Sequence, residues 1–162
     1  MNILSRILNK IAYMAPCGYA VRPWLQRLRG VQMGKCVWLA QAVYIDNLHP
    51  EDLTLGDNSS VGYGTAIFTH TYPGPKRPQS NGKVVIEEEV FVGPRCLILP
   101  NVRIGRGSVI KAGTVVSSNV PPSSFFGNPP AQVLGKVTVP MTMEREYKEF
   151  VLGLRPKRPV KR

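Results

Sequence analysis

Apolar residues recur every six positions through most of the chain, and this period predicts the fold class. These residues, called lead positions below, are Met33, Leu39, Ile45, Leu55, Val61, Ile67, Ile86, Val92, Ile98, Ile104, Ile110 and Val116. A helix places apolar residues every three or four positions and a half-buried strand every two, so neither explains a strict period of six. A short fixed repeat is typical of a solenoid, in which each turn buries its apolar side against its neighbours.

The remaining positions of each six-residue unit support an all-β solenoid. The residue after a lead position is often Gly, and the residue four places after it is nearly always small or β-branched. If three units form one triangular coil, then Met33, Leu55, Ile86 and Ile104 head four successive coils. The lead positions should point inward and stack, while Gly and Asn at the corners tolerate the tight turns.

The two ends of the chain depart from this period. Apolar residues at positions 3, 4, 7, 8 and 11 predict one or two short helices within residues 1–30. This segment either caps the open end of the solenoid, which is the preferred interpretation, or rests on a membrane as a basic amphipathic helix. The two roles are compatible. Residues 31–135 form the predicted solenoid, and 136–162 a C-terminal helix starting at Thr142, followed by a basic tail.

Two interruptions of the period mark the candidate site. Ile45 and Leu55 are ten residues apart and Ile67 and Ile86 nineteen, so both insertions follow the third unit of a coil. They should therefore leave the same corner of the solenoid on adjacent coils, where function is often placed. Two candidate residues stand at this corner and are expected to point outward: Asp46 and His70. A histidine beside a carboxylate can serve as a general base.

Composition and charge narrow the class of protein. At 162 residues the chain suits one domain, and no stretch approaches the roughly 20 apolar residues that span a bilayer. The net charge of +11 suits phosphate-bearing substrates or an anionic membrane surface. The basic residues lie mainly at the two ends without interleaved aromatic residues, which argues against nucleic acid as a partner. Three cysteines without metal-type spacing fit a cytoplasmic protein.

The six-residue units resemble the hexapeptide repeat, [Leu/Ile/Val]-Gly-x-x-[Ser/Thr/Ala/Val]-x, of which IGRGSV (104–109) and VGYGTA (61–66) are good copies. From Met33 to about Lys136 the chain is similar to the hexapeptide acyltransferases, in particular the maltose, galactoside and polysaccharide-building sugar O-acetyltransferases. The stretches VYIDNLHPEDLTLGDNSSVGYGTAIFTH and IKAGTVVSSNVPPSSFFGNPPAQVLGK carry this likeness. The resemblance implies a left-handed parallel β-helix of about four coils, assembled as a homotrimer with acetyl-CoA between neighbouring solenoids.

The resemblance also implies roles for individual residues. His70 matches the catalytic general base, and Asp46 stands where the sugar acetyltransferases place a polar residue that binds the acceptor. Lys76 and Arg77 of the long insertion are further acceptor-binding candidates. The candidates for binding the cofactor acetyl-CoA are Phe91, Ala112, Gly113 and Lys136. Pro94 departs from the family pattern, because it lacks the N–H that related enzymes can use as an oxyanion donor.

The leading functional hypothesis is acetyl-CoA-dependent O-acetylation of a sugar hydroxyl during surface-polysaccharide assembly, with the sugar free, nucleotide-linked or lipid-linked. N-acetylation of a nucleotide-linked amino sugar and a non-catalytic scaffold stay open as alternatives. The zinc-dependent carbonic anhydrase built on this fold needs three histidines, and the chain has only His49 and His70, so no metal is expected. A peripheral position at the inner face of the cell membrane would suit a lipid-linked acceptor.

Overall fold

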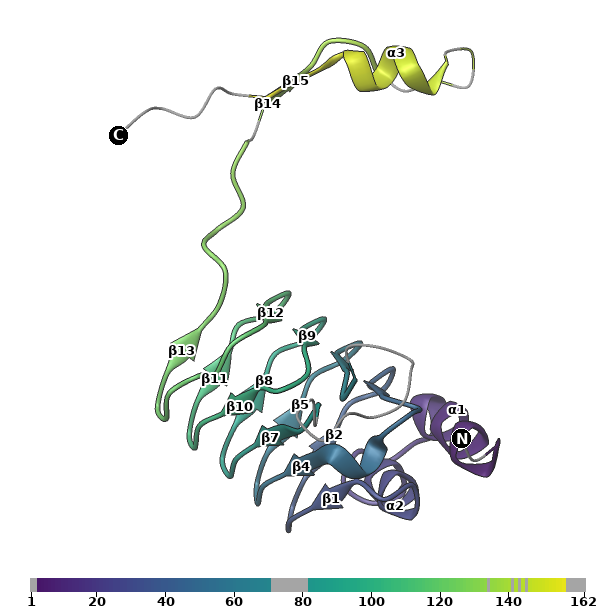
Figure 1. Cartoon of the computed structure of the whole chain (residues 1–162), viewed down its shortest axis with the longest axis vertical. Coiled ribbons are helices and arrows are strands. Elements are labelled where there is room, and N and C mark those ends of the chain that lie inside the picture. The colour runs from purple at the N-terminus through teal and green to yellow at the C-terminus, as the bar shows by residue number, and fades with distance from the viewer. Residues whose placement is uncertain are drawn as a thin grey trace. The chain divides into compact units, whose positions relative to one another are not determined.

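Short parallel strands, most of them two residues long, wind around one axis and form three sheets (Figure 1). The computed structural model describes residues 3–70, 82–133, 135–140, 142, 144 and 146–156. Sheet A contains, in order, β1 (Gln32–Met33), β4 (Leu53–Leu55), β7 (Val84–Ile86) and β10 (Arg103–Ile104). Sheet B contains β13 (Phe125–Phe126), β11 (Val109–Ile110), β8 (Phe91–Val92), β5 (Ser60–Val61) and β2 (Trp38–Leu39). Sheet C contains β12 (Val115–Val116), β9 (Leu97–Ile98), β6 (Ala66–Ile67) and β3 (Tyr44–Ile45).

The strand register follows the six-residue period of the sequence. Met33 pairs with Leu55, Leu55 with Ile86, and Ile86 with Ile104, so each lead position lies on the lead position of the next coil. All lead positions except Met33 are fully buried, and Met33 packs against their cluster. Three parallel sheets stacked in this way fit the left-handed β-helix that the repeats predict. Beyond β12, Val120 bridges to Ile104 and β13 pairs with β11, which adds part of a further coil.

The turns between strands use one left-handed residue in most units, and only half of these residues are the Gly or Asn that the sequence predicts at the corners. In ten units the third residue after the inward-facing one has a φ between +53° and +72°. These residues are Cys36, Ala42, Asn58, Gly64, Glu89, Arg95, Asn101, Gly107, Gly113 and Ser123. Most of them are not glycine, although the left-handed region is costly for residues with a Cβ.

The glycines that follow the lead positions have a different purpose from the one predicted. Gly56 has no positive φ, but a Cβ on it would lie 2.4 Å from the backbone nitrogen of Glu88 on the next coil. Glycine is therefore required there by the close stacking of successive coils rather than by a tight turn.

Two helices cover the first coil. Helix α1 (Ile3–Met14) contacts α2 (Val21–Leu28) and β3, and α2 contacts β1 and β2. A 3₁₀ helix (Pro50–Asp52) occupies the shorter insertion between β3 and β4. None of the described helices is long and apolar enough to cross a membrane.

Residues 1–128 form one compact unit and 129–162 a second one. In the second unit, β14 (Gly135–Val137) pairs antiparallel with β15 (Leu154–Pro156). Helix α3 covers only Tyr147–Leu152, so the helix predicted from Thr142 to Leu154 is shorter than expected. Its last carbonyls accept the N–H of Gly153, and Leu154 already pairs with Val137 in the sheet.

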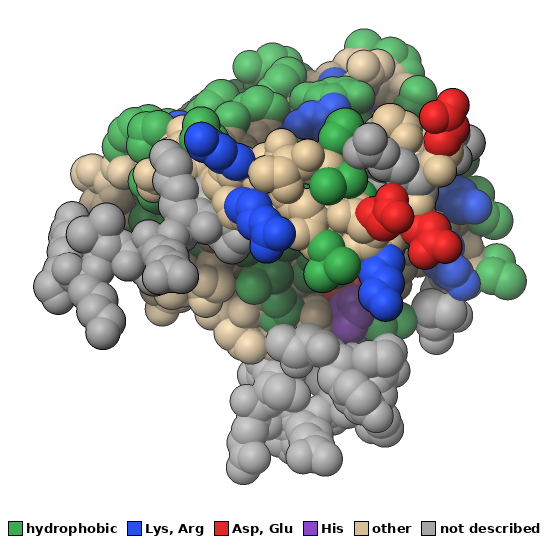
Figure 2. All heavy atoms as spheres, turned by 90° about the horizontal axis from the view of Figure 1, so that it is seen from above, with side chains coloured by type: hydrophobic (Ala, Val, Ile, Leu, Met, Phe, Trp, Pro, Cys, Tyr) green, Lys and Arg blue, Asp and Glu red, His purple; other side chains and the backbone are tan. Residues whose placement is uncertain are grey.

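On the face in Figure 2, Lys and Arg side chains do not gather in one continuous patch.

Candidate active site

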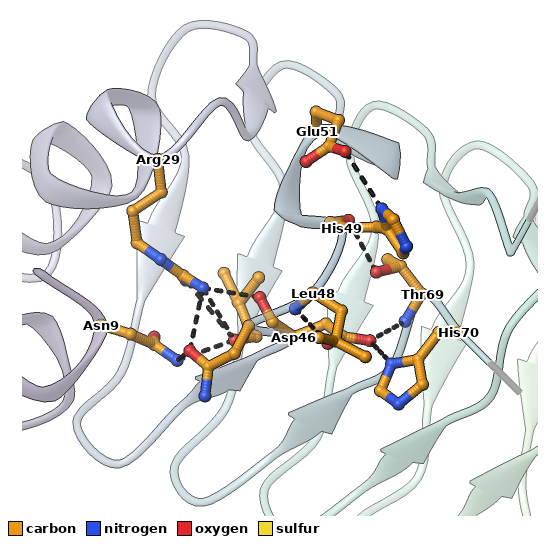
Figure 3. A network of polar contacts seen from close by, with 10 residues as sticks. Asn9, Arg29, Asp46, Leu48, His49, Glu51, Thr69 and His70 are labelled. Atoms are coloured by element: carbon orange, nitrogen blue, oxygen red, sulfur yellow. Dashed lines mark hydrogen bonds and ion pairs between the residues drawn. The ribbon is translucent and has the colours of Figure 1, made fainter. Parts of the chain in front are cut away.

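His70 and Asp46 are in contact at one corner of the solenoid, as the two insertions predict. Asp46 directly follows β3 on the first coil, and His70 lies three residues after β6 on the second. The backbone N–H of Asp46 donates to the carbonyl of Ile67 (N–O distance 3.0 Å), which locks the two coils together at this level. Nδ1 of His70 faces Oδ2 of Asp46 in a short polar contact (Figure 3).

The Asp46 side chain is completely buried, although it lies at the corner and not in the apolar core. Its Oδ1 accepts the backbone N–H of Leu48 at 2.9 Å, and its Oδ2 accepts that of Thr69 at 2.8 Å in addition to contacting His70. Burial alone would raise the pKa of this carboxyl, but the hydrogen bonds from Leu48, His70 and Thr69 outweigh it and leave the pKa below its usual value. Asp46 is therefore ionised at neutral pH.

An ionised Asp46 determines which nitrogen of His70 carries the proton. A carboxylate can only accept hydrogen bonds, so Nδ1 of His70 must be the donor and Nε2 of the neutral ring must be unprotonated. Nε2 points away from Asp46 (Figure 3), and 24% of the His70 side chain is exposed. Oγ1 of Thr69 donates to the carbonyl of His49 (2.7 Å), which fixes the chain just before the histidine. The pair thus presents an accessible, oriented base.

Aromatic rings line the same corner. The ring centroids of Tyr44 and Phe68 are 5.4 Å apart, and Phe68 meets His70 edge-on with centroids 6.3 Å apart. These contacts limit the orientations of the imidazole and give the corner an apolar wall.

A polar network from the two helices holds the other side of the Asp46 backbone. Nη2 of Arg29 donates to the carbonyl of Asp46 at 2.6 Å, and Nδ2 of Asn9 donates to the carbonyl of Ile45 at 2.8 Å (Figure 3). Gln26 links the helices by donating to Oδ1 of Asn9 at 3.1 Å. Arg29, Asn9 and Gln26 are all buried. Burial lowers the pKa of Arg29 to about 10, although nearby Tyr44 and Asp46 oppose this shift.

The sequence analysis missed this network. Asn9 lies on the side of the first helix opposite its apolar stripe, so the apolar pattern gives no sign that this residue is buried. Nothing in the sequence distinguishes Arg29 from the other arginines near it.

We expect Arg29→Met to lower the free energy of unfolding by about 1–3 kcal/mol, because the carbonyl of Asp46 loses its buried donor. Methionine retains the apolar stem of the side chain. Urea denaturation measures the loss, and Arg27→Met, an exposed position two residues earlier, is the matched control. Equal losses in the two variants would mean that the buried network does not stabilise the corner.

The other predicted site residues lie elsewhere. Phe91 projects from β8 in sheet B and is 45% exposed, while Ala112 and Gly113 form the turn between β11 and β12. In one chain these three residues therefore lie on a different sheet and corner from His70. Lys136 is an exposed residue of β14 in the second unit. Two acceptor-binding candidates, Lys76 and Arg77, lie outside the described residues.

Comparison with known proteins places these features in context. Residues 83–118 match the family described as bacterial transferase hexapeptide (six repeats). The chain is 38% identical over 130 residues to "Putative acetyltransferase YvoF" of Bacillus subtilis, covering 79% of this chain and 73% of that protein. It is 32% identical over 102 residues to 2,3,4,5-tetrahydropyridine-2,6-dicarboxylate N-acetyltransferase of Staphylococcus aureus, covering 63% of this chain but 39% of that enzyme.

Among solved structures, the chain resembles the hexapeptide-repeat-containing acetyltransferase VCA0836 of Vibrio cholerae, complexed with acetyl coenzyme A. The TM-score is 0.55 at 22% identity, covering 74% of this chain and 77% of that one. At this identity the likeness supports the shared fold.

Proposed function

This chain belongs to the hexapeptide-repeat transferases and is an acyl-CoA-dependent acyltransferase, and we propose that it transfers an acetyl group from acetyl-CoA to a sugar hydroxyl in surface-polysaccharide assembly. The observation that carries the proposal is the His70–Asp46 pair, in which a buried carboxylate orients an accessible imidazole. The acetyl group is supported by the names of the relatives and by the acetyl-CoA complex of the Vibrio protein.

The geometry supports a direct transfer. Nε2 of His70 accepts the proton of the acceptor hydroxyl as its oxygen attacks the thioester carbonyl. The tetrahedral intermediate then collapses, the C–S bond breaks, and the proton on His70 passes to the departing thiolate of CoA. Asp46 stays ionised throughout and stabilises the imidazolium that forms between these steps.

In this mechanism the oxyanion must be stabilised by a group other than the backbone N–H at position 94 that related enzymes can use. Pro94 has no N–H, and the N–H of the neighbouring Gly93 already donates to the carbonyl of Ile110 at 2.9 Å. Neither backbone group is available to the intermediate.

The arrangement of the candidate residues supports a site shared between copies of the chain, and the family likeness suggests that the copies form a homotrimer. Phe91, Ala112 and Gly113 are remote from His70 along the surface of one solenoid, so we propose that they bind acetyl-CoA beside the His70 of a neighbouring copy. In this proposal Lys136 contacts the nucleotide phosphates, and Lys76 and Arg77 contact the acceptor. Acyl-CoA thioesters are made in the cytoplasm, which supports a cytoplasmic location, peripheral to the membrane if the acceptor is lipid-linked.

Asp46 has two candidate roles, and its burial favours the second. The family likeness suggests direct contact with the acceptor, but both carboxylate oxygens are occupied by Leu48, Thr69 and His70. We therefore propose that Asp46 orients His70 and stabilises its protonated form during the reaction.

A second candidate function is N-acetylation of an amino sugar carried on a nucleotide. It is favoured by the identity of 32% to an N-acetyltransferase, of which the chain spans 39%. The same base and donor would serve both reactions, because a hydroxyl and a protonated amine both need to lose a proton for acyl transfer.

The proposal is tested by measuring thiol release from acetyl-CoA with free sugars, nucleotide amino sugars and lipid-linked saccharides, with mass spectrometry of the product. Acceptor-dependent release of CoA with formation of an acetylated saccharide is the expected result. Treatment with hydroxylamine distinguishes the products, since it cleaves an O-acetyl ester and leaves an N-acetyl amide intact. Failure of acetyl-CoA to bind in calorimetry, together with no release for any acceptor, would contradict the proposal.

A further inference from the structure

Helix α1 packs through the side that holds Asn9, Ala12 and Leu8, which lies away from its other large aliphatic residues. Asn9 and Ala12 are its buried residues, and Asn9 is bonded to the carbonyl of Ile45. A helix that served only as a cap would be expected to bury its apolar stripe instead. In Figure 1, α1 lies at the outer edge of the solenoid, next to α2.

The apolar side of α1 is left exposed. Its members, called the α1 apolar face below, are Ile3 (74% exposed), Leu4 (57%), Ile7 (51%), Ile11 (51%) and Met14 (69%). At about 100° per residue they fall within one arc of about 100°, away from the buried Asn9. On the adjacent helix, Trp24 and Leu28 are also more than half exposed. Large aliphatic side chains grouped in this way indicate a surface that a membrane or another molecule covers.

The charge around this face has one sign. The first 45 residues contain six Lys and Arg residues and no Asp or Glu. Two of the six, Arg22 and Arg29, are buried in hydrogen bonds to backbone carbonyls. Arg6 and Lys10 on α1 and Arg27 on α2 are exposed, and no salt bridge joins any of them to another described residue.

We propose that the α1 apolar face docks on the surface of an anionic lipid bilayer. An aliphatic stripe flanked by cations is the pattern of helices that lie in the interface of a membrane, and a tryptophan on the adjacent helix suits the headgroup region. The cations are complementary to anionic headgroups, which favours a lipid surface over a second copy of this basic chain. None of the described helices can cross the bilayer, so α1 lies on the membrane and does not span it.

Docking would also bring the candidate active site to the membrane. The buried side of α1 contacts the strand that leads into Asp46, because Asn9 bonds to the carbonyl of Ile45 and to Oδ1 of Asn47, each at 2.8 Å. The His70–Asp46 corner thus lies on the same end of the solenoid as the docking helix, within reach of a saccharide attached to a lipid.

The experiment is co-sedimentation of the full chain with vesicles of phosphatidylcholine alone or mixed with phosphatidylglycerol. We expect binding to the mixed vesicles that weakens as salt is raised. The double variant Ile7→Glu/Ile11→Glu should bind at least about tenfold more weakly, since it places anions in the centre of the face. The control Val151→Glu/Leu152→Glu changes two exposed aliphatic residues of α3 and should bind as the wild type does.

Circular dichroism checks that the variants are folded, and a milder pair, Arg6→Gln/Lys10→Gln, should keep the fold and lose the preference for phosphatidylglycerol. Equal binding to both vesicle types, or wild-type binding by Ile7→Glu/Ile11→Glu, would overturn the proposal. So would the absence of vesicle binding together with a smaller assembly of that variant in analytical ultracentrifugation, which would assign the face to contact between copies. The proposal is independent of the acyltransferase chemistry, because a chain that bound vesicles without transferring acetyl groups would still support it.

Discussion

Replacement of His70 by alanine should lower kcat for acyl transfer by about 10²- to 10⁴-fold, the range typical of a lost general base. Without Nε2 the corner loses the base that accepts the proton of the acceptor as it attacks the thioester. The side chain is partly exposed and lies outside the apolar core, so the fold should be retained. Initial rates of thiol release at saturating acetyl-CoA, with circular dichroism of the variant, measure the effect.

The chain supplies its own control, because it contains one other histidine. His49 lies near the same corner, and its Nδ1 is 3.2 Å from Oε1 of Glu51 at the surface. Its backbone carbonyl accepts the Thr69 hydroxyl, and this bond survives in His49→Ala. His49→Ala should therefore keep near-normal turnover. A His70→Ala variant that remained as active as His49→Ala would exclude His70 as the base.

Asp46→Asn should lower both activity and stability. The two carboxylate oxygens face two backbone donors, the N–H groups of Leu48 and Thr69. In either orientation an asparagine would direct its NH₂ group at one of these donors, which costs about 1–3 kcal/mol of unfolding free energy. The neutral amide also no longer stabilises the imidazolium, so kcat should fall by about 10²-fold or more.

The split between kcat and KM in Asp46→Asn separates a role in orienting the base from contact with the acceptor. If Asp46 orients His70 and stabilises the imidazolium, kcat should fall while KM for the acceptor stays close to the wild-type value. A raised KM for the acceptor with unchanged kcat would instead favour direct contact with the acceptor.

The free energy of unfolding should depend on the ionisation of Asp46. The pKa of Asp46 is lowered in the folded state, so its stabilisation is present above the unfolded value of about 3.9 and is lost as pH falls below it through the folded value. Urea midpoints measured from neutral pH downward should therefore converge for wild type and Asp46→Asn in acid. Parallel curves would mean that the carboxylate is not stabilising.

The solenoid could be predicted from sequence because its core is built from one six-residue unit that repeats along the chain. Each lead position stacks on the next lead position, so one pattern of six residues determines the whole register. The role of the glycines could not be read in the same way. Gly56 is required by the backbone of Glu88, thirty-two positions later, and sequence spacing does not show how closely two coils approach.

The sequence predicted which two residues form the candidate site, but it did not predict their burial or their hydrogen bonds. Two insertions at equivalent points of adjacent coils were enough to bring Asp46 and His70 together. That Asp46 is buried depends on the N–H groups of Leu48 and Thr69, which every residue except proline possesses and no sequence pattern marks. The contacts of Asn9 and Arg29 join non-repeating helices to the first coil, where the period gives no information.

The His70–Asp46 pair is shared between the first two coils, and this has a consequence for how activity is lost. Solenoids open from their ends, since a terminal coil has a neighbour on one side only. Separation of the first coil would remove Asp46 from His70 while the later coils kept their hydrogen bonds. Catalysis would then disappear under milder conditions than the bulk β signal. The packing of α1 and α2 on the first coil would therefore determine how long the enzyme stays active.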